Sequence, residues 1–185
     1  IENYNSARTY KLKEIGLKLN QDSLSLMYDY SDLARILYYE KENIKADKLT
    51  KKIIDYAQRN RHLDLLNTAF TRHRTYLVEN GKLMELSELY TKTYPKELAR
   101  LQRSDTGTYY RTMALISEAQ GLNNEANQFY QKVELQFDSQ NTNSVLLSNI
   151  YKRYGQFLWR TGQPILAIDK IKRSYHFAQV ANYLP

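Results

Sequence analysis

Apolar and small residues recur at positions i, i+3, i+4 and i+7 on both sides of short breaks in the chain, which is the spacing of one face of an α-helix. The clearest stretch runs from Tyr110 to Ser117, breaks at Gly121 and resumes from Ala126 to Val133. This pattern predicts two helices joined by a tight turn. The same template fits around Gly162, with Tyr151, Tyr154, Gly155, Leu158, Ala167, Ile171 and Ser174.

The pattern repeats along the chain with a nearly constant step. The residue that opens each second helix recurs at steps of 39, 40, 40 and 41, at Ala7, Ala46, Leu86, Ala126 and Ala167. The close-packing position of the first helix recurs at steps of 40, 40 and 41, at Ala34, Arg74, Ala114 and Gly155. Because the two series agree, we expect hairpins at 23–60, 64–102, 105–137 and 144–180, preceded by a second helix alone at 1–20.

Composition favours the same fold. The 185 residues include six Gly and three Pro, which is too few for the dense turns of an all-β protein. Hydrophobic residues make up 42% and charged residues 25%, so the chain has enough apolar surface to fold. The sequence therefore predicts an all-α protein. It contains no run of about eighteen apolar residues, so we expect no membrane span, and the absence of Cys leaves the compartment open.

The order of residue types in these hairpins resembles the pattern of the tetratricopeptide repeat family. In that pattern a large residue is followed four positions later by a small one, then by a glycine turn, and then by a small residue that opens the second helix. The two C-terminal hairpins match this order best. Upstream, the 23–60 hairpin lacks the turn glycine, and Arg74 stands where a small residue is usual. We expect Arg74 to loosen the local packing, or to reach solvent along its aliphatic stem.

The resemblance implies a right-handed superhelical solenoid of antiparallel helical hairpins, with about nine helices in a single repeat domain over 1–185. The family unit is about 34 residues. The longer units of this chain resemble those of bacterial regulators and sensor proteins. This implies a fragment of a larger bacterial signalling protein that binds a peptide or a partner protein.

Residues for catalysis or for metal binding do not form a recognisable set. The three histidines, His62, His73 and His176, show no metal-binding spacing, and phosphate-binding glycine motifs and nucleophile elbows are absent from the sequence. We therefore predict no catalytic residue, no cofactor and no metal, and expect that the chain is not an enzyme.

The resemblance also places a contact surface on the inner face of the solenoid, on the first helix of each hairpin. In this sequence, the corresponding positions are Ser31, Thr71, Thr112 and Leu115, together with nine candidates for contact. The candidates for peptide contact are Arg35, Tyr38, Arg72, Thr75, Arg111, Lys152, Arg153, Gln156 and Trp159. Because this set is basic and partly aromatic, it favours an acidic peptide or a terminal carboxylate. The alternative is that these are ordinary solvated charges.

Two interpretations of Trp159 stay open: it anchors a bound peptide, or it covers the end of the stack or contacts a further helix. The net charge of +7 raises a second function, a basic nucleic-acid-binding repeat protein. However, residues 1–100 carry +4 and residues 101–185 carry +3, without a concentrated block. A protein-binding module is therefore the favoured prediction. The sequence does not predict an oligomeric state.

Overall fold

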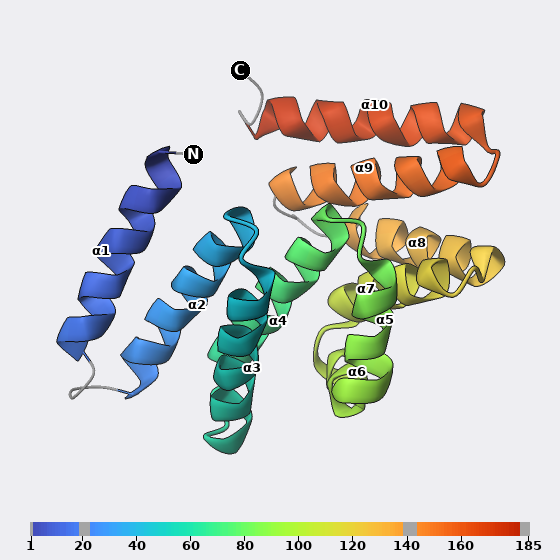
Figure 1. Ribbon diagram of the computed structural model, residues 1–185. Coiled ribbons are helices and arrows are strands. Elements are labelled where there is room, and N and C mark those ends of the chain that lie inside the picture. The colour runs from blue at the N-terminus through green and yellow to red at the C-terminus, as the bar shows by residue number, and fades with distance from the viewer. Residues whose placement is uncertain (1, 19–22, 139–143, 182–185) are drawn as a thin grey trace. The chain divides into compact units, whose positions relative to one another are not determined.

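The computed structural model describes residues 2–18, 23–138 and 144–181, and this part of the chain is helical apart from short turns (Figure 1). The described residues form ten α-helices and one π-helical segment and contain no β-strand. The all-α prediction is confirmed. The chain divides into two compact units, Ile1–Gly81 and Lys82–Pro185. No helix within the described ranges is long and apolar enough to cross a bilayer.

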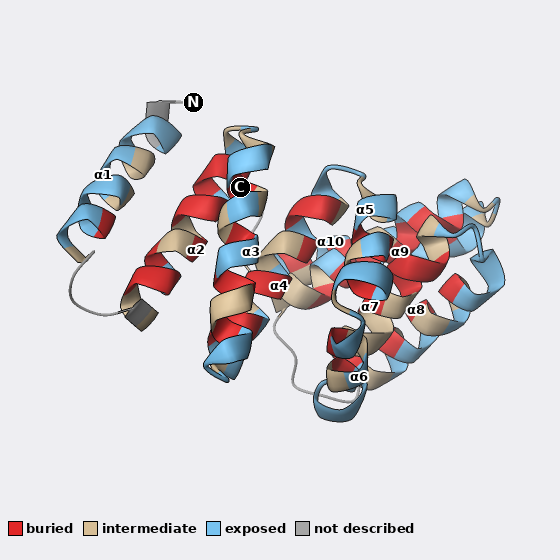
Figure 2. Cartoon of the chain, turned by 60° about the horizontal axis from the view of Figure 1, so that its bottom comes forward, coloured by how far each residue is buried: buried red, intermediate tan, exposed pale blue. Residues whose placement is uncertain are grey.

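The first unit contains four helices, α1 (Glu2–Lys18), α2 (Ser23–Tyr39), α3 (Asn43–Arg59) and α4 (Leu63–Glu79). Helices α2 and α3 pair across a short turn, α1 packs on α2, and α4 packs on both α3 and α2. Their core includes the aliphatic residues Leu37, Ile53 and Leu65, each at most 3% exposed. Figure 2 shows buried residues along α2, α3 and α4, whereas α1 is mostly exposed or half-buried.

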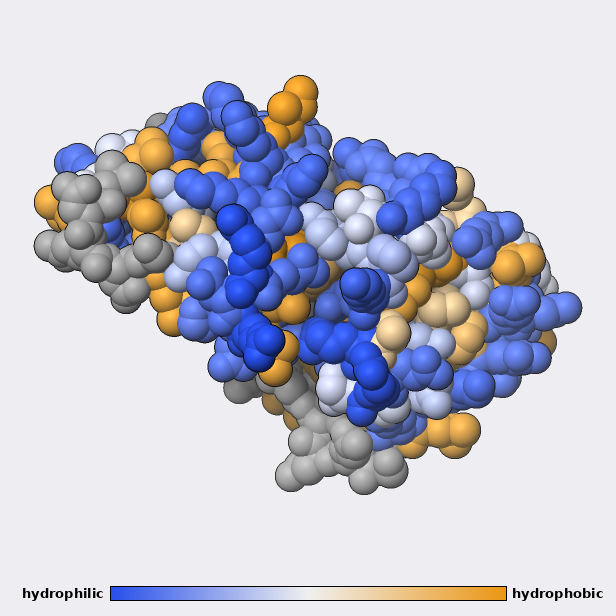
Figure 3. All heavy atoms as spheres, turned by 90° about the horizontal axis from the view of Figure 1, so that it is seen from below, coloured by the Kyte–Doolittle hydropathy of each residue, from blue (hydrophilic) through white to orange (hydrophobic). Residues whose placement is uncertain are grey.

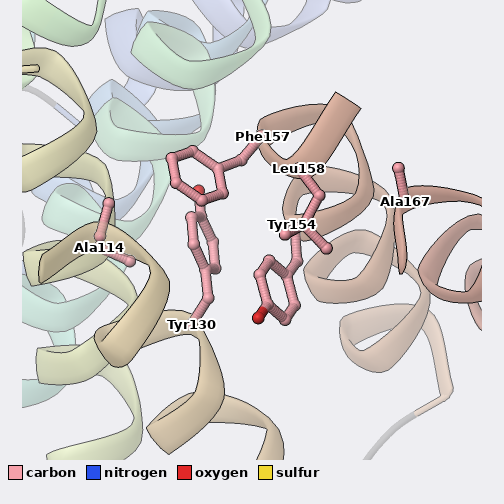
Figure 4. Close-up of a cluster of buried hydrophobic side chains, with 7 residues drawn as sticks. Ala114, Tyr130, Tyr154, Phe157, Leu158 and Ala167 are labelled. Carbon is pink, nitrogen blue, oxygen red and sulfur yellow. The ribbon is translucent and has the colours of Figure 1, made fainter. Parts of the chain in front are cut away.

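The second unit contains α5 (Leu83–Glu88), the π-helical segment η1 (Leu89–Thr93), α6 (Pro95–Ser104), α7 (Thr106–Ala119), α8 (Asn123–Asp138), α9 (Ser144–Arg160) and α10 (Pro164–Val180). Helix α7 pairs with α8 and α9 pairs with α10, while α5 and α6 pack on α7. The ring centroid of Tyr130 on α8 lies 4.9 Å from that of Tyr154 and 5.2 Å from that of Phe157, both on α9. These rings form a core cluster beside Ala114 of α7 (Figure 4).

Paired helices occupy three of the predicted hairpins, at 23–60, 105–137 and 144–180. The hairpin predicted at 64–102 is different, because the boundary between the two units falls after Gly81 and assigns α4 and α5 to separate units. Helix α1 corresponds to the lone helix expected at 1–20. The solenoid arrangement of the hairpins stays a prediction.

The second helix expected within 64–102 is interrupted at Tyr94, so the described chain has ten helices rather than about nine. Pro95 has no N–H, and its ring disfavours the helical conformation in the residue before it. Tyr94 accordingly takes φ −130° and ψ 58°, and Pro95 begins α6. The backbone N–H of Tyr94 donates to the carbonyl of Leu89 at 2.8 Å, which is the wider turn of η1.

Five of the described turns contain a residue in the left-handed conformation. Gly81, Gly121 and Gly162 have φ of 69°, 74° and 78°, as their role in the predicted turns requires. Lys41 and Arg61 take the same conformation, with φ of 63° and 56°. The 23–60 hairpin therefore makes the same turn without a glycine, and its sequence carries no sign of this.

The predicted packing positions of the second helices are confirmed at four of their five residues, whereas the fifth, Ala7 on α1, is only half-buried. Ala46, Leu86, Ala126 and Ala167 are each at most 1% exposed. Arg74 is a correction, because its side chain does not reach solvent and the residue is only 4% exposed. The reason is helical geometry: Arg74 lies on the same face of α4 as Phe70 and Leu77, both 2% exposed, and this face is the packed one.

Gly155 sets how closely α9 approaches α10. A Cβ atom at Gly155 would lie 2.8 Å from both Cδ1 and Cγ1 of Ile171 and 3.1 Å from the backbone carbonyl oxygen of Ala167. The backbone contact cannot be relieved by a change of rotamer. The expectation that close packing explains this mid-helix glycine is therefore confirmed.

We predict that Gly155→Ala destabilises the protein by about 1–3 kcal/mol, because the added methyl group must push the two helices apart. Gly16, in the last turn of α1, provides the control, since a Cβ atom there meets no atom within 4 Å. Gly16→Ala should be neutral or stabilise by up to about 1 kcal/mol through helix propensity. Urea unfolding followed by circular dichroism measures both variants, and equal stability changes would contradict the packing argument.

Ion pairs join helix α1 to α2 and to the turn that follows α2. Among its residues with described side chains, only Ile15 is buried, whereas Tyr10, Leu12 and Leu17 are exposed. A guanidinium nitrogen of Arg8 lies 3.1 Å from a carboxylate oxygen of Glu40 and 2.6 Å from one of Glu42. Two lysines share Asp29: Lys11 Nζ lies 3.1 Å from Oδ1 and Lys18 Nζ lies 2.8 Å from Oδ2.

Asp29 is the centre of this attachment, with only 6% of the residue exposed. Burial alone raises the pKa of a carboxyl group, but the hydrogen bonds from Lys18 and Lys11, together with their charges, outweigh it. The pKa of Asp29 is therefore lowered from its usual 3.8. A carboxyl group with a lowered pKa stabilises the folded state fully above its unfolded pKa, and this contribution is lost as the pH falls through the folded value.

We predict that Asp29→Asn accelerates amide hydrogen exchange in α1 by about tenfold or more, with much smaller effects in α3. Salt of about 0.5 M or a pH below about 3 should reduce the difference from wild type, because both conditions weaken the same ion pairs. Glu79→Gln, at an exposed carboxylate in the same unit, is the matched control. Unchanged protection of α1 in Asp29→Asn would show that apolar contacts hold this helix.

Candidate functional site

The structure distributes the nine candidate contact residues over both units. Arg35 and Tyr38 on α2 and Arg72 and Thr75 on α4 belong to the first unit. The remaining residues belong to the second unit, with one on α7 and four on α9, namely Arg111, Lys152, Arg153, Gln156 and Trp159.

In the first unit, the candidate residues are largely occupied by contacts within the unit. Arg72 pairs with Asp32 at 2.8 Å and donates to the hydroxyl oxygen of Ser31 at 2.7 Å. Arg35 and Thr75 are exposed. The first unit thus provides few free cations at the predicted positions.

Tyr38 was predicted to lie on an open contact surface, but it is a core residue with 6% exposure. Its hydroxyl group donates to Asp47 Oδ1 at 2.8 Å and lies 3.2 Å from the hydroxyl of Thr50. Its ring stacks on Tyr76 of α4 at 3.8 Å. Burial, which is the main cause, raises the pKa of this hydroxyl group, so it stays protonated as a donor. Tyr38 joins α2, α3 and α4 rather than contacting a peptide.

In the second unit, three of the four candidates on α9 border an apolar groove of about 680 Å³ between α9 and α10. Helix α9 contributes Arg153, Gly155, Gln156, Trp159 and Arg160. Helix α10 contributes Ala167, Ile168, Ile171 and Lys172. The large apolar side chains are unusually open to solvent, since Trp159 is 64%, Ile168 49% and Ile171 43% exposed. The structure thus brings together three predicted residues, Arg153, Gln156 and Trp159, with several that were not predicted.

The other two candidates of this unit are not part of the groove. Arg111 on α7 is half-buried, and Lys152 is exposed on α9. Two further positions of the expected inner face are core positions, since Thr112 is 0% and Leu115 is 6% exposed. Thr112 donates its hydroxyl hydrogen to the carbonyl of Thr108 at 2.8 Å.

A buried carboxylate from α7 organises the arginines beside the groove. One Glu118 oxygen accepts a hydrogen bond from Arg153 at 2.7 Å and also from Arg160, and the other accepts from the hydroxyl of Tyr130 at 2.9 Å. The Glu118 side chain is only 6% exposed. Burial, followed by the charge of Glu118, raises the pKa of Tyr130, so this hydroxyl remains a donor. Lys172, in contrast, has no ion-pair partner among the described residues.

The charge of the chain is concentrated in the hairpin that contains the groove. Residues 144–180 contain six basic residues and one acidic residue, a net charge of +5 out of +7 for the whole chain. The net charge of residues 101–185 as a whole does not show this concentration, because residues 101–143 have a net negative charge. Polar side chains cover most of the face seen in Figure 3, with apolar groups scattered among them.

The sequence contained a signal for the unpredicted groove residues. Ala167, Ile171 and Ser174 were assigned to the stripe that packs on α9, but Ile165, Leu166 and Ile168 lie outside that stripe. A helix with apolar residues on more than one face has more apolar surface than a single partner helix covers. In the structure, these three residues are 83%, 51% and 49% exposed.

The histidines remain separate from this groove. His73 packs on Tyr38 and its Nε2 lies 3.3 Å from Asp47 Oδ1, while His62 stacks on Tyr56. Within the described ranges, no group of three or more His, Cys, Asp or Glu residues could hold a metal ion.

Comparison with known proteins found no matching family model, curated protein or solved structure. The resemblance to the tetratricopeptide repeat family stays a prediction that rests on the residues quoted above.

We predict that Glu118→Gln destabilises the protein by about 2 kcal/mol, because it leaves the largely buried Arg153 guanidinium without its counter-charge. Glu125→Gln is the control, at an exposed carboxylate on α8, and should change the stability by less than about 0.5 kcal/mol. Urea unfolding measures both changes. Equal stabilities of the two variants would show that Glu118 does not organise the arginines.

Proposed function

We propose that this chain is a protein-binding module built from helical hairpins, and that its binding surface is the groove between α9 and α10. The observation that carries the proposal is the open apolar cluster of Trp159, Ile168 and Ile171, bordered by basic side chains. Exposed apolar surface rimmed by polar groups is typical of interaction sites, and Trp is common at their energetic centres. The resemblance to tetratricopeptide repeats supports the same class of function.

The proposal retains the predicted class of partner but moves the contact surface. Arg153, Gln156 and Trp159 remain candidate contact residues, and the groove residues of α10 are added to them. A regulatory role in a larger signalling protein stays a prediction that rests on the resemblance alone.

Selection from a random display library of peptides of about 16 residues tests the proposal. We expect binders with dissociation constants in the micromolar range that lose about tenfold or more of their affinity for Trp159→Ala. Tyr175→Ala is the matched control, since Tyr175 is an aromatic residue on α10, 57% exposed and outside the groove. Binders that retain full affinity for Trp159→Ala would place the contact surface elsewhere.

The same preparations test the alternative function. A nucleic-acid-binding protein should retard random DNA or RNA in a gel, with an affinity that falls steeply between about 50 and 200 mM salt. Such binding, in the absence of peptide binders, would replace the proposal.

A further inference from the structure

The repeat register shows which surface the groove corresponds to in the other hairpins. Trp159 lies four residues after Gly155, the close-packing position of its first helix. The residues four positions after Ala34 and Ala114, the equivalents of Gly155, are Tyr38 and Glu118. The same side of a helix returns after about four residues, so these three residues occupy equivalent places.

In both earlier hairpins this place is covered by the next helix of the same unit. Tyr38 lies under α4, with ring distances of 3.8 Å to Tyr76 and 5.8 Å to His73. Glu118 lies under α9, which supplies Arg153 and Arg160. No described residue covers Trp159 in this way, and it is 64% exposed.

The second helices repeat this difference. Four residues after the buried alanines at 46 and 126 stand Thr50 and Tyr130, both 4% exposed. The equivalent residue after Ala167 is Ile171, which is 43% exposed. The α9–α10 groove is therefore the counterpart of surfaces that the chain twice covers with a helix.

One equivalent position defines the chemistry that the covering helix must offer. Directly after the opening alanine, the earlier hairpins carry Asp47 and Asn127, which accept hydrogen bonds from Tyr38 and Tyr154. Tyr154 belongs to the covering helix α9, and Asp47 also pairs with His73 of the covering helix α4. The α9–α10 hairpin carries Ile168 at this position. A polar side chain facing Ile168 would lose its hydrogen bonds to water, so the covering helix must present an apolar side chain here.

Charge defines the outer part of the same contact. The α9–α10 hairpin has a net charge of +5, and Lys172, which lines the groove, has no ion-pair partner among the described residues. Glu118 already neutralises part of the charge of Arg153 and Arg160, and Glu134 on α8 pairs with Lys170 and Arg173. Carboxylates beside the apolar face of a covering helix would complement the remaining charge.

We propose that the α9–α10 groove binds an acidic amphipathic helix of a partner protein, which lies across the hairpin as α9 lies across α7 and α8. This inference rests on the proposed function and names its partner class. The apolar face of the helix contacts Trp159, Ile168 and Ile171, and its acidic flank faces Lys172 and Arg160. An exposed Trp beside basic residues also suits single-stranded nucleic acid, but the aliphatic floor offers no stacking surface for successive bases.

Three display libraries of about 16-residue peptides, a length of roughly four helical turns, test this proposal on the full chain. The first places apolar residues at i, i+3, i+4 and i+7 with Glu or Gln elsewhere. The second has the same composition in strict alternation, and the third replaces Glu by Lys in the helical pattern. We expect enrichment from the first library only. Enrichment from the second or third library, or from none, overturns the proposal.

Trp159 provides a direct readout, because it is the only Trp of the chain and the peptides contain none. Binding of a selected peptide should shift its fluorescence to shorter wavelength, and Ile168→Asn should weaken the affinity by about tenfold. Lys172→Glu should weaken it about threefold to tenfold, less at high salt, whereas Lys48→Glu on α3 should have little effect. A selected peptide that leaves the Trp159 emission unchanged contradicts binding in the groove.

Two other occupants have distinct outcomes. Self-association that sedimentation detects and Trp159→Ala abolishes would assign the groove to a second copy of the chain. Random DNA that shifts the Trp159 emission would assign it to nucleic acid. If random peptides select Trp159-dependent binders while the acidic helical library fails, the proposed function stands and the helical partner is wrong.

Discussion

The close approach of paired helices at a small residue is the constraint on which the rest of the structure depends. Ala46, Ala126 and Ala167 are almost completely buried, and Gly155 leaves no room for a methyl group against α10. Close contact fixes the relative rotation of the two paired helices. The residue one turn after the close-packing residue therefore lies on the side of the hairpin that a following helix can cover. Tyr38, Glu118 and Trp159 occupy equivalent places for this reason, although their side chains share no chemistry. The groove follows from the same rule that builds the core.

The sequence predicted the all-α fold and most helix boundaries because both depend on short-range periodicity. It did not predict the break at Tyr94, where Pro95 acts on the residue before it, nor the left-handed turns at Lys41 and Arg61, where neither residue type signals this conformation. Arg74 was expected to loosen the local packing or to reach solvent, yet its position on the packed face of α4 determined its burial. Local pattern therefore located the elements better than it located individual long side chains.

The candidate site shows a similar division. Arg153, Gln156 and Trp159 were found from the family pattern, since the positions beside the packing stripe recur with the repeat. Tyr38 was misplaced because the pattern does not say which of these positions the next helix covers. The role of Glu118 could not be predicted, because its hydrogen bonds to Arg153 and Arg160 join residues 35 and 42 positions away. Such long-range pairs leave no periodic trace in one sequence.

The ionic attachment of α1 has a consequence for how freely its sequence can vary. A packed core constrains the shape of every contacting side chain, whereas ion pairs constrain only the sign of a charge and its place along the helix. Tyr10, Leu12 and Leu17 are exposed and are subject to neither constraint. In related chains, α1 should therefore diverge quickly in its exposed apolar residues, while the spacing of Arg8, Lys11 and Lys18 against Asp29, Glu40 and Glu42 persists.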